Sequence, residues 1–102
     1  MKNTKRARLA AHGWRVGSAA EFLELTPEEA AFVETKLALS RCVRSRRTAQ
    51  NISQAVLAKR LKSSQSRIAK IEAADPSVSI DLLLSTLFAL GAKPKDVATA
   101  IL

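Results

Sequence analysis

Apolar residues recur with a helical period along most of the chain, and short polar clusters separate the periodic segments. Thr26 can cap a helix, and Glu29 stands at the spacing that completes a capping box. We expect this helix to run to about Gln50 and to end at Asn51, which tolerates the left-handed conformation of a helix end. Its predicted buried side holds Phe32, Val33, Leu37, Leu39, Cys42 and Val43.

Serine residues precede three further periodic segments and are suited to cap them. Asp75-Pro76 interrupts the helical pattern, Gly91 ends another helix, and Pro94 begins a short last helix to Leu102. The three caps and their predicted helices are Ser53 with 54–61, Ser64 with 65–72, and Ser79 with 80–90. The pattern predicts an all-α fold.

The N-terminal part of the chain is less regular. Residues 1–12 lack helical periodicity and are predicted to be a flexible basic tail. Residues 13–102 are predicted to form a single domain of five or six helices, the extra one a short helix over 18–25. Trp14 is expected to fold back onto this domain, with a partner-docking role as the alternative.

Positive charge is concentrated in two places. The net charge of the chain is +8, with 17 Lys and Arg against 9 Asp and Glu. Residues 1–15 carry five basic residues and no acidic one, whereas residues 41–72 carry nine basic residues and a single acidic one, Glu72. This balance favours an acidic polymer, above all nucleic acid, as the partner.

Several classes of function are disfavoured. No paired carboxylates, Ser/His/Asp set, glycine-rich phosphate loop or metal-ligand spacing is present, so we expect neither an enzyme nor a cofactor. Cys42 is the single cysteine and is expected to be a small buried residue in a reducing compartment. No apolar run approaches the ~20 residues that span a bilayer, so a cytoplasmic location is expected.

The segment 53–72 has the geometry of a helix-turn-helix, with two helices of about eight residues joined by a short turn. Leu57, Leu61, Ile68 and Ile71 provide a shared core, and Ala58 is small where the helix axes cross. The outward side of the second helix carries hydrogen-bonding side chains of the kinds that read base edges, although a solvated helix face is the alternative. These side chains are Gln65, Ser66, Arg67 and Lys70.

Between about Leu37 and Gly91 the chain resembles the Xre (Cro/phage-repressor-type) helix-turn-helix family, which has a lambda-repressor-like fold. The matching residues are Arg47, Ser53-Gln54, Leu57-Ala58, Leu61, Ser64, Ile68 and Ile71-Glu72. The resemblance implies double-stranded operator DNA as the partner, with Gln65, Ser66, Arg67 and Lys70 facing bases. It also implies phosphate contacts from Gln54, Ser64, Arg44, Arg47 and Lys59.

Two departures concern the ends of the motif helices. The family usually has glycine where Lys62 stands and an apolar residue where Ser63 stands, so a less tightly packed turn is expected. It often has Asn-Gly where this chain has Ala73-Ala74.

The flanking runs GWRVGSAAEFLELTPEE and SQSRIAKIEAADPSVSIDLL resemble an antitoxin-like branch of type II toxin–antitoxin systems. This resemblance implies a bacterial, nucleoid-associated repressor of its own operon that binds a small basic toxin. The alternatives are a stand-alone Xre-type repressor and a protein-interaction module that has lost DNA binding.

The C-terminal region is more apolar than one small domain readily buries. We therefore expect a homodimer that reads two half-sites roughly 34 Å apart. The predicted dimer interface consists of Leu84, Leu87, Val97 and Ile101.

Overall fold

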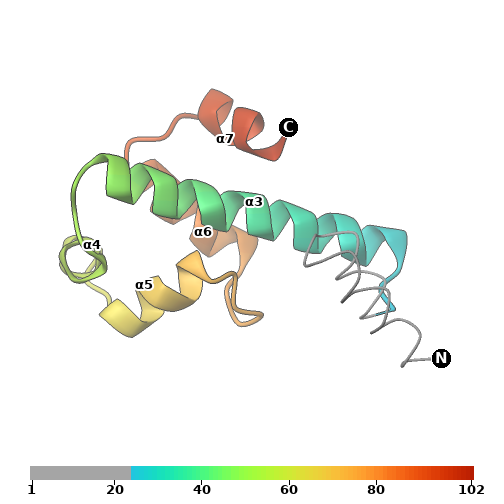
Figure 1. Ribbon diagram of the computed structural model, residues 1–102, viewed down its shortest axis with the longest axis horizontal. Coiled ribbons are helices and arrows are strands. Elements are labelled where there is room, and N and C mark those ends of the chain that lie inside the picture. The colour runs from blue at the N-terminus through green and yellow to red at the C-terminus, as the bar shows by residue number, and fades with distance from the viewer. Residues whose placement is uncertain (1–23) are drawn as a thin grey trace, which may run out of the picture. The chain divides into compact units, whose positions relative to one another are not determined.

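The computed structural model describes residues 24–102, and within this range every regular element is an α-helix (Figure 1). The predicted all-α fold is confirmed. The predictions for residues 1–12 and Trp14 lie outside the described residues, as does most of the predicted 18–25 helix, whose last residues Glu24 and Leu25 are not helical. The five helices are α3 (Pro27–Ala49), α4 (Gln54–Arg60), α5 (Gln65–Glu72), α6 (Ile80–Ala89) and α7 (Pro94–Ile101).

The chain divides into two compact units, one ending at Thr35 and the other comprising Lys36–Leu102. In the first unit, the predicted capping box at the start of α3 is present. The Thr26 N–H donates to Glu29 Oε1 at 2.9 Å, and the Glu29 N–H donates to Thr26 Oγ1 at 3.2 Å. The hydrogen bond from the Thr26 backbone is the main reason that the pKa of Glu29 lies below its ordinary value.

Among residues 24–102, the buried hydrophobic core consists of residues of the second unit. Its members come from α3 to α6 and from the segments that follow α5 and α6, because each of these helices has one apolar side. They are Leu39, Val43, Leu57, Ala58, Ile68, Ile71, Val78, Leu83, Leu87, Leu90 and Ala92. Burying each of the larger side chains stabilises the fold by about 1.5–3 kcal/mol relative to leaving it exposed.

The predicted buried side of α3 is only partly correct. Leu39 and Val43 are buried, whereas Val33, Leu37 and Cys42 are half-buried. Phe32 is 55% exposed, so its predicted burial is wrong. The reason is its position, since Leu39 is the first member of the buried hydrophobic core among residues 24–102.

Four of the helices end in the same way. The residue after the C-cap has a positive φ, and the two residues that follow the cap donate backwards to carbonyls of the last turn, which is the Schellman arrangement. Asn51 (φ 58°) after α3 and Gly91 (φ 90°) after α6 fill this position as expected. Both residue types adopt it at low cost.

Lys62 and Ala74 occupy the same left-handed position after α4 and α5, with φ 55° and 54°. After α4, the Ser63 N–H donates to the Ala58 carbonyl at 2.8 Å, and after α5 the Asp75 N–H donates to the Lys70 carbonyl at 3.1 Å. A residue with a Cβ is strained at these angles by roughly 1–2 kcal/mol. The hydrogen bonds and the packing of the motif hold both residues there.

Candidate nucleic-acid interface

Helices α4 and α5 are each capped at their start and share a buried core. Ser53 Oγ accepts a hydrogen bond from the Val56 N–H at 3.1 Å, and Ser64 Oγ accepts one from the Arg67 N–H at 3.2 Å. Each cap satisfies a backbone donor that the first turn of a helix leaves without a partner. The buried side chains of the two helices are Leu57, Ala58, Ile68 and Ile71.

The outer face of α5 carries the side chains that the sequence predicted to face DNA bases. Gln65, Ser66, Arg67 and Lys70 are all exposed. Ser66 Oγ lies 3.2 Å from Ser64 Oγ, and the other three side chains have no hydrogen-bond or ion-pair partner within residues 24–102. These polar groups are therefore free to bind a ligand.

The segment that contains this face, residues 41–72, is strongly basic. Seven of the nine cations in residues 41–72 are exposed, and the only acid in that range, Glu72, has a side chain that is 5% exposed. The face is thus suited to a polyanion. The seven exposed cations are Arg41, Arg44, Lys59, Arg60, Lys62, Arg67 and Lys70.

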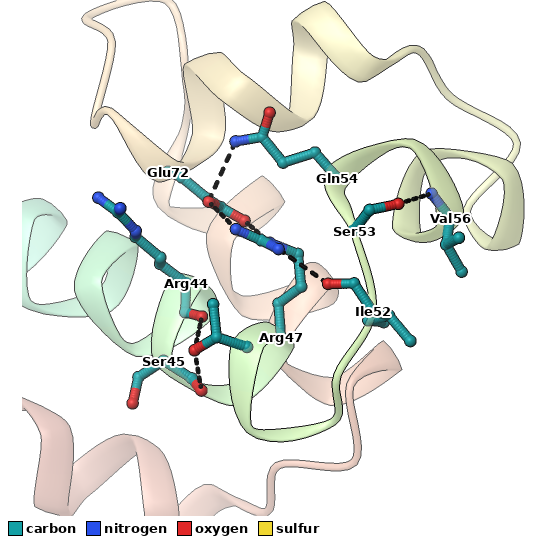
Figure 2. A network of polar contacts seen from close by, with 9 residues as sticks. Arg44, Ser45, Arg47, Ile52, Ser53, Gln54, Val56 and Glu72 are labelled. Carbon is teal, nitrogen blue, oxygen red and sulfur yellow. Dashed lines mark hydrogen bonds and ion pairs between the residues drawn. The ribbon is translucent and has the colours of Figure 1, made fainter.

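Glu72 is the centre of a polar network that joins the ends of three segments (Figure 2). Arg47, near the end of α3, forms an ion pair through Nε with Glu72 Oε2 and donates from NH2 to Glu72 Oε1 at 3.0 Å. Its NH1 group donates to the Ile52 carbonyl at 2.8 Å. Gln54 Nε2, at the start of α4, donates to Glu72 Oε1 at 3.2 Å. The network therefore connects α3, α4 and the end of α5.

The charges in this network stabilise one another. Burial alone would raise the pKa of Glu72, but the hydrogen bonds from Arg47 and Gln54 and the nearby charges of Arg47 and Arg44 together lower it below its ordinary value. The hydrogen bond with Glu72 raises the pKa of Arg47. Both groups are consequently ionised at neutral pH, as a bidentate arginine–carboxylate pair requires.

The residues predicted to contact phosphate fall into two groups. Arg44 and Lys59 are exposed, and Ser64 is exposed while its hydroxyl caps α5. Arg47 and Gln54 instead bind Glu72 within the chain. The Arg47 side chain is only 13% exposed, so its geometry favours a supporting role.

A shallow hollow of about 250 Å³ lies beside the Glu72 network, and both Arg47 and Glu72 line it. Arg44 and Gln54 line it together with Ala69 and Ala73 of the α5 end. Sequence reasoning did not single out Ala69, because alanine has no chemistry that marks a site, and it noted Ala73 only as a departure from the family's Asn-Gly. Small side chains at this place leave room for a close approach by another molecule. The sequence did contain one signal for the network, since Glu72 is the lone acid in a basic segment.

The residues predicted for a dimer interface are not equally accessible. Leu84 and Val97 are half-buried, and Ile101 is 47% exposed. Leu87 is fully buried in the core of its own chain, so a second copy cannot reach it. Its neighbour Phe88 is 47% exposed and is the large apolar side chain that sequence reasoning missed at this place.

Residues 24–102 contain neither a metal-binding cluster nor a membrane-spanning helix. No group of three or more His, Cys, Asp or Glu side chains in this range is placed to hold a metal ion. None of the helices described here is both long and apolar enough to cross a membrane.

One comparison with known proteins gives a match. The model of the helix-turn-helix domain family matches residues 38–100, which contain α4, α5 and α6 and most of α3 and α7. No curated protein and no solved structure matches the chain. The family match covers more than half of the chain, and it coincides with the capped helix pair and the exposed basic face. The chain therefore belongs to the helix-turn-helix domain family, and this membership indicates DNA binding.

Proposed function

We propose that the protein is a sequence-specific transcriptional repressor that inserts the outer face of α5 into the major groove of operator DNA. The observation that carries this proposal is the exposed polar face of α5, which presents Gln65, Ser66 and Lys70 on a helix that is firmly capped and packed. Such a helix presents its side chains to base edges at little further entropic cost.

Each exposed side chain has a role that its chemistry suggests. The amide of Gln65 pairs bidentately with adenine, Ser66 and Lys70 contact neighbouring base edges, and Arg67 reaches a base or the flanking phosphate. Arg44, Lys59 and Ser64 contact phosphates on either side, and so does the N–H of the Gln54 amide that does not donate to Glu72. We assign Arg47 a positioning role, since its guanidinium holds Glu72 and thereby fixes α5 against α3.

The repressor acts as a homodimer in this proposal. One α5 reads only a few base pairs, whereas two copies related by a two-fold axis read half-sites about 34 Å apart and gain affinity and specificity together. The partly exposed apolar residues of the C-terminal helices, Leu84, Phe88, Val97 and Ile101, are the proposed contact surface. Ultracentrifugation at micromolar concentration tests this, and a purely monomeric protein would contradict it.

Selection of binding sites from a random pool of duplex DNA, followed by fluorescence anisotropy, tests the DNA-binding proposal. The wild-type chain should enrich a two-fold symmetric sequence and bind it with a steep salt dependence of about −0.9 per neutralised phosphate in the logarithmic slope. Lys70→Ala should weaken binding at least fivefold. Lys95→Ala on α7 is the matched control, because it removes one exposed lysine far along the chain from α5. Equal affinities of the two variants would contradict the proposal.

The repressor is further proposed to be the antitoxin of a type II toxin–antitoxin pair that controls its own operon. The support is the resemblance of the segments that flank the motif. Native purification of the chain expressed with its neighbouring genes tests this, and the expected result is a small, basic, growth-inhibiting partner. Operator binding without such a partner would favour a stand-alone repressor. Absence of any DNA binding would favour a protein-interaction module.

A further inference from the structure

A hollow of about 290 Å³ lies beneath the turn that joins α4 to α5, on the side where α6 packs. Its apolar lining comes from α5, from α6 and from the turn between α4 and α5. Leu61 follows α4, Ile68 and Ile71 belong to α5, and Leu82 belongs to α6. Ile68 and Ile71 are at most 1% exposed over the whole residue, so the hollow reaches down to the core.

The charged residues that line the hollow are all basic. Lys62 and Arg67 are exposed residues that border the hollow, and none of its lining residues is acidic. Ser63 also lines it, and its hydroxyl has no hydrogen-bond partner within residues 24–102. Two cations and a free hydroxyl donor beside an apolar floor match a carboxylate that carries a short apolar tail.

The size of the hollow limits the ligand. It lies near the lower end of the roughly 300–1,000 Å³ that small-molecule sites occupy. An aliphatic acid of about five to eight carbons fits this space, whereas a nucleotide or a peptide does not.

Arg67 connects this hollow with the proposed DNA-binding face. Arg67 also borders a second hollow, which is lined by Ser64, Ser66 and Lys70 at α5 and by Ser77, Val78 and Leu82 of the segment after α5 and of α6. This second hollow therefore includes residues of the proposed DNA-binding face. The single guanidinium of Arg67 cannot form its full set of hydrogen bonds with a carboxylate beneath the turn and with DNA at the same time. A ligand held by Arg67 therefore competes with DNA for this residue.

We propose that the hollow beneath the turn binds a small aliphatic carboxylate, and that the bound acid weakens DNA binding by engaging Arg67. The competition with DNA rests on the proposed repressor function, whereas binding of the acid does not. The occupant would act as an inducer, because its concentration would set the fraction of protein bound to the operator.

Hexanoate is the probe for the experiment, with acetate as the control without a tail and 1-hexanol as the control without a charge. Binding to the full-length ¹⁵N-labelled chain is followed by NMR, and DNA binding by anisotropy on the duplex selected from the random pool. Hexanoate should shift the amide signals of Lys62, Ser63 and Thr86 and should bind at least tenfold more tightly than either control. It should also weaken DNA binding severalfold.

Ser63→Leu fills the hollow and should abolish the effect of hexanoate while it leaves DNA binding in place. Ser63→Val is the milder variant if the leucine does not fit, and Ser45→Leu on the exposed side of α3 is the matched control. Absence of hexanoate binding, or binding that Ser63→Leu leaves unchanged, would overturn the proposal, and the hollow would then be only a packing defect. If the chain binds hexanoate but binds no DNA, the carboxylate site is supported and the proposed repressor function is refuted.

Discussion

The two sides of α5 use similar polar residues in opposite ways. On the inner side, Glu72 is almost fully buried and binds Arg47 and Gln54, so its charge is matched within the chain. On the outer side, Gln65 and Lys70 are exposed, and their side chains form no hydrogen bond or ion pair within residues 24–102. Residue type alone therefore does not separate a supporting side chain from a recognising one. Burial and pairing do separate them. Substitutions in the buried Glu72 network should lower folding stability, whereas substitutions on the exposed face of α5 should weaken DNA binding.

The largest expected effect is on folding stability, from Arg47→Met. This variant leaves the Glu72 carboxylate buried without its cation, and breaking a buried pair in this way costs about 3 kcal/mol. Urea unfolding measures the loss. Arg44→Met is the matched control, because Arg44 is exposed and its removal should change stability by less than about 0.5 kcal/mol. Equal losses from both variants would remove the distinction between the two arginines.

The next effect is on DNA binding, from Gln65→Ala. Losing a bidentate contact with a base should cost about 1–3 kcal/mol of binding free energy on the selected duplex, with no measurable loss of stability. Gln50→Ala gives the opposite pattern, because the Gln50 amide donates to the Leu90 carbonyl at 2.7 Å within the fold. It should lower stability by about 1 kcal/mol. Anisotropy measures the DNA affinity of both variants, and urea unfolding measures their stability. A similar loss of stability in Gln65→Ala and Gln50→Ala would contradict the prediction.

A smaller effect is expected on the free energy of unfolding at acidic pH. The pKa of Glu72 is lowered in the folded state, so its contribution is fully present above the ordinary value of 4.5 and is lost as the pH falls through the lowered pKa. Glu72→Gln should therefore flatten the decline in unfolding free energy below pH 4.5. Part of the decline should remain, because the pKa values of Glu29 and Asp75 are also lowered, that of Asp75 chiefly by the hydrogen bond from the Ser77 hydroxyl. An unchanged decline in the variant would contradict the role of Glu72.

The smallest effects lie at the ends of the two motif helices. Lys62→Gly and Ala74→Gly should each raise stability by about 1 kcal/mol, because glycine adopts the left-handed conformation without strain. Gly91→Ala should lower it by about 1 kcal/mol, although its added Cβ would meet no atom within 4 Å. Thermal unfolding of the three variants provides the measurement. A loss of stability in both glycine variants would show that the two turns are not strained.

Local features of the fold were predictable from the sequence, whereas long-range features were not. The caps Ser53, Ser64 and Ser79 and the stop at Asn51 each depend on neighbouring residues and were predicted correctly. Lys62 and Ala74 were not recognised as left-handed residues, because neither side chain favours that conformation.

In the candidate site, too, local features were predictable from the sequence and long-range contacts were not. Its exposed face follows from helical spacing, and the positions of Gln65 and Lys70 on it were predicted. The pairing of Arg47 with Glu72 joins residues 25 positions apart, which no local pattern reveals. The burial of Leu87 and the exposure of Phe32 depend likewise on which segments pack together.

The most direct test of recognition by α5 compares base discrimination by the wild-type chain and by Gln65→Ala. Both proteins are titrated by anisotropy against the selected duplex and against a set of duplexes that each carry one substituted base pair. The variant should lose about 1–3 kcal/mol of discrimination at a single position and keep it at the others. Discrimination that is unchanged at every position would contradict the proposal that Gln65 reads a base.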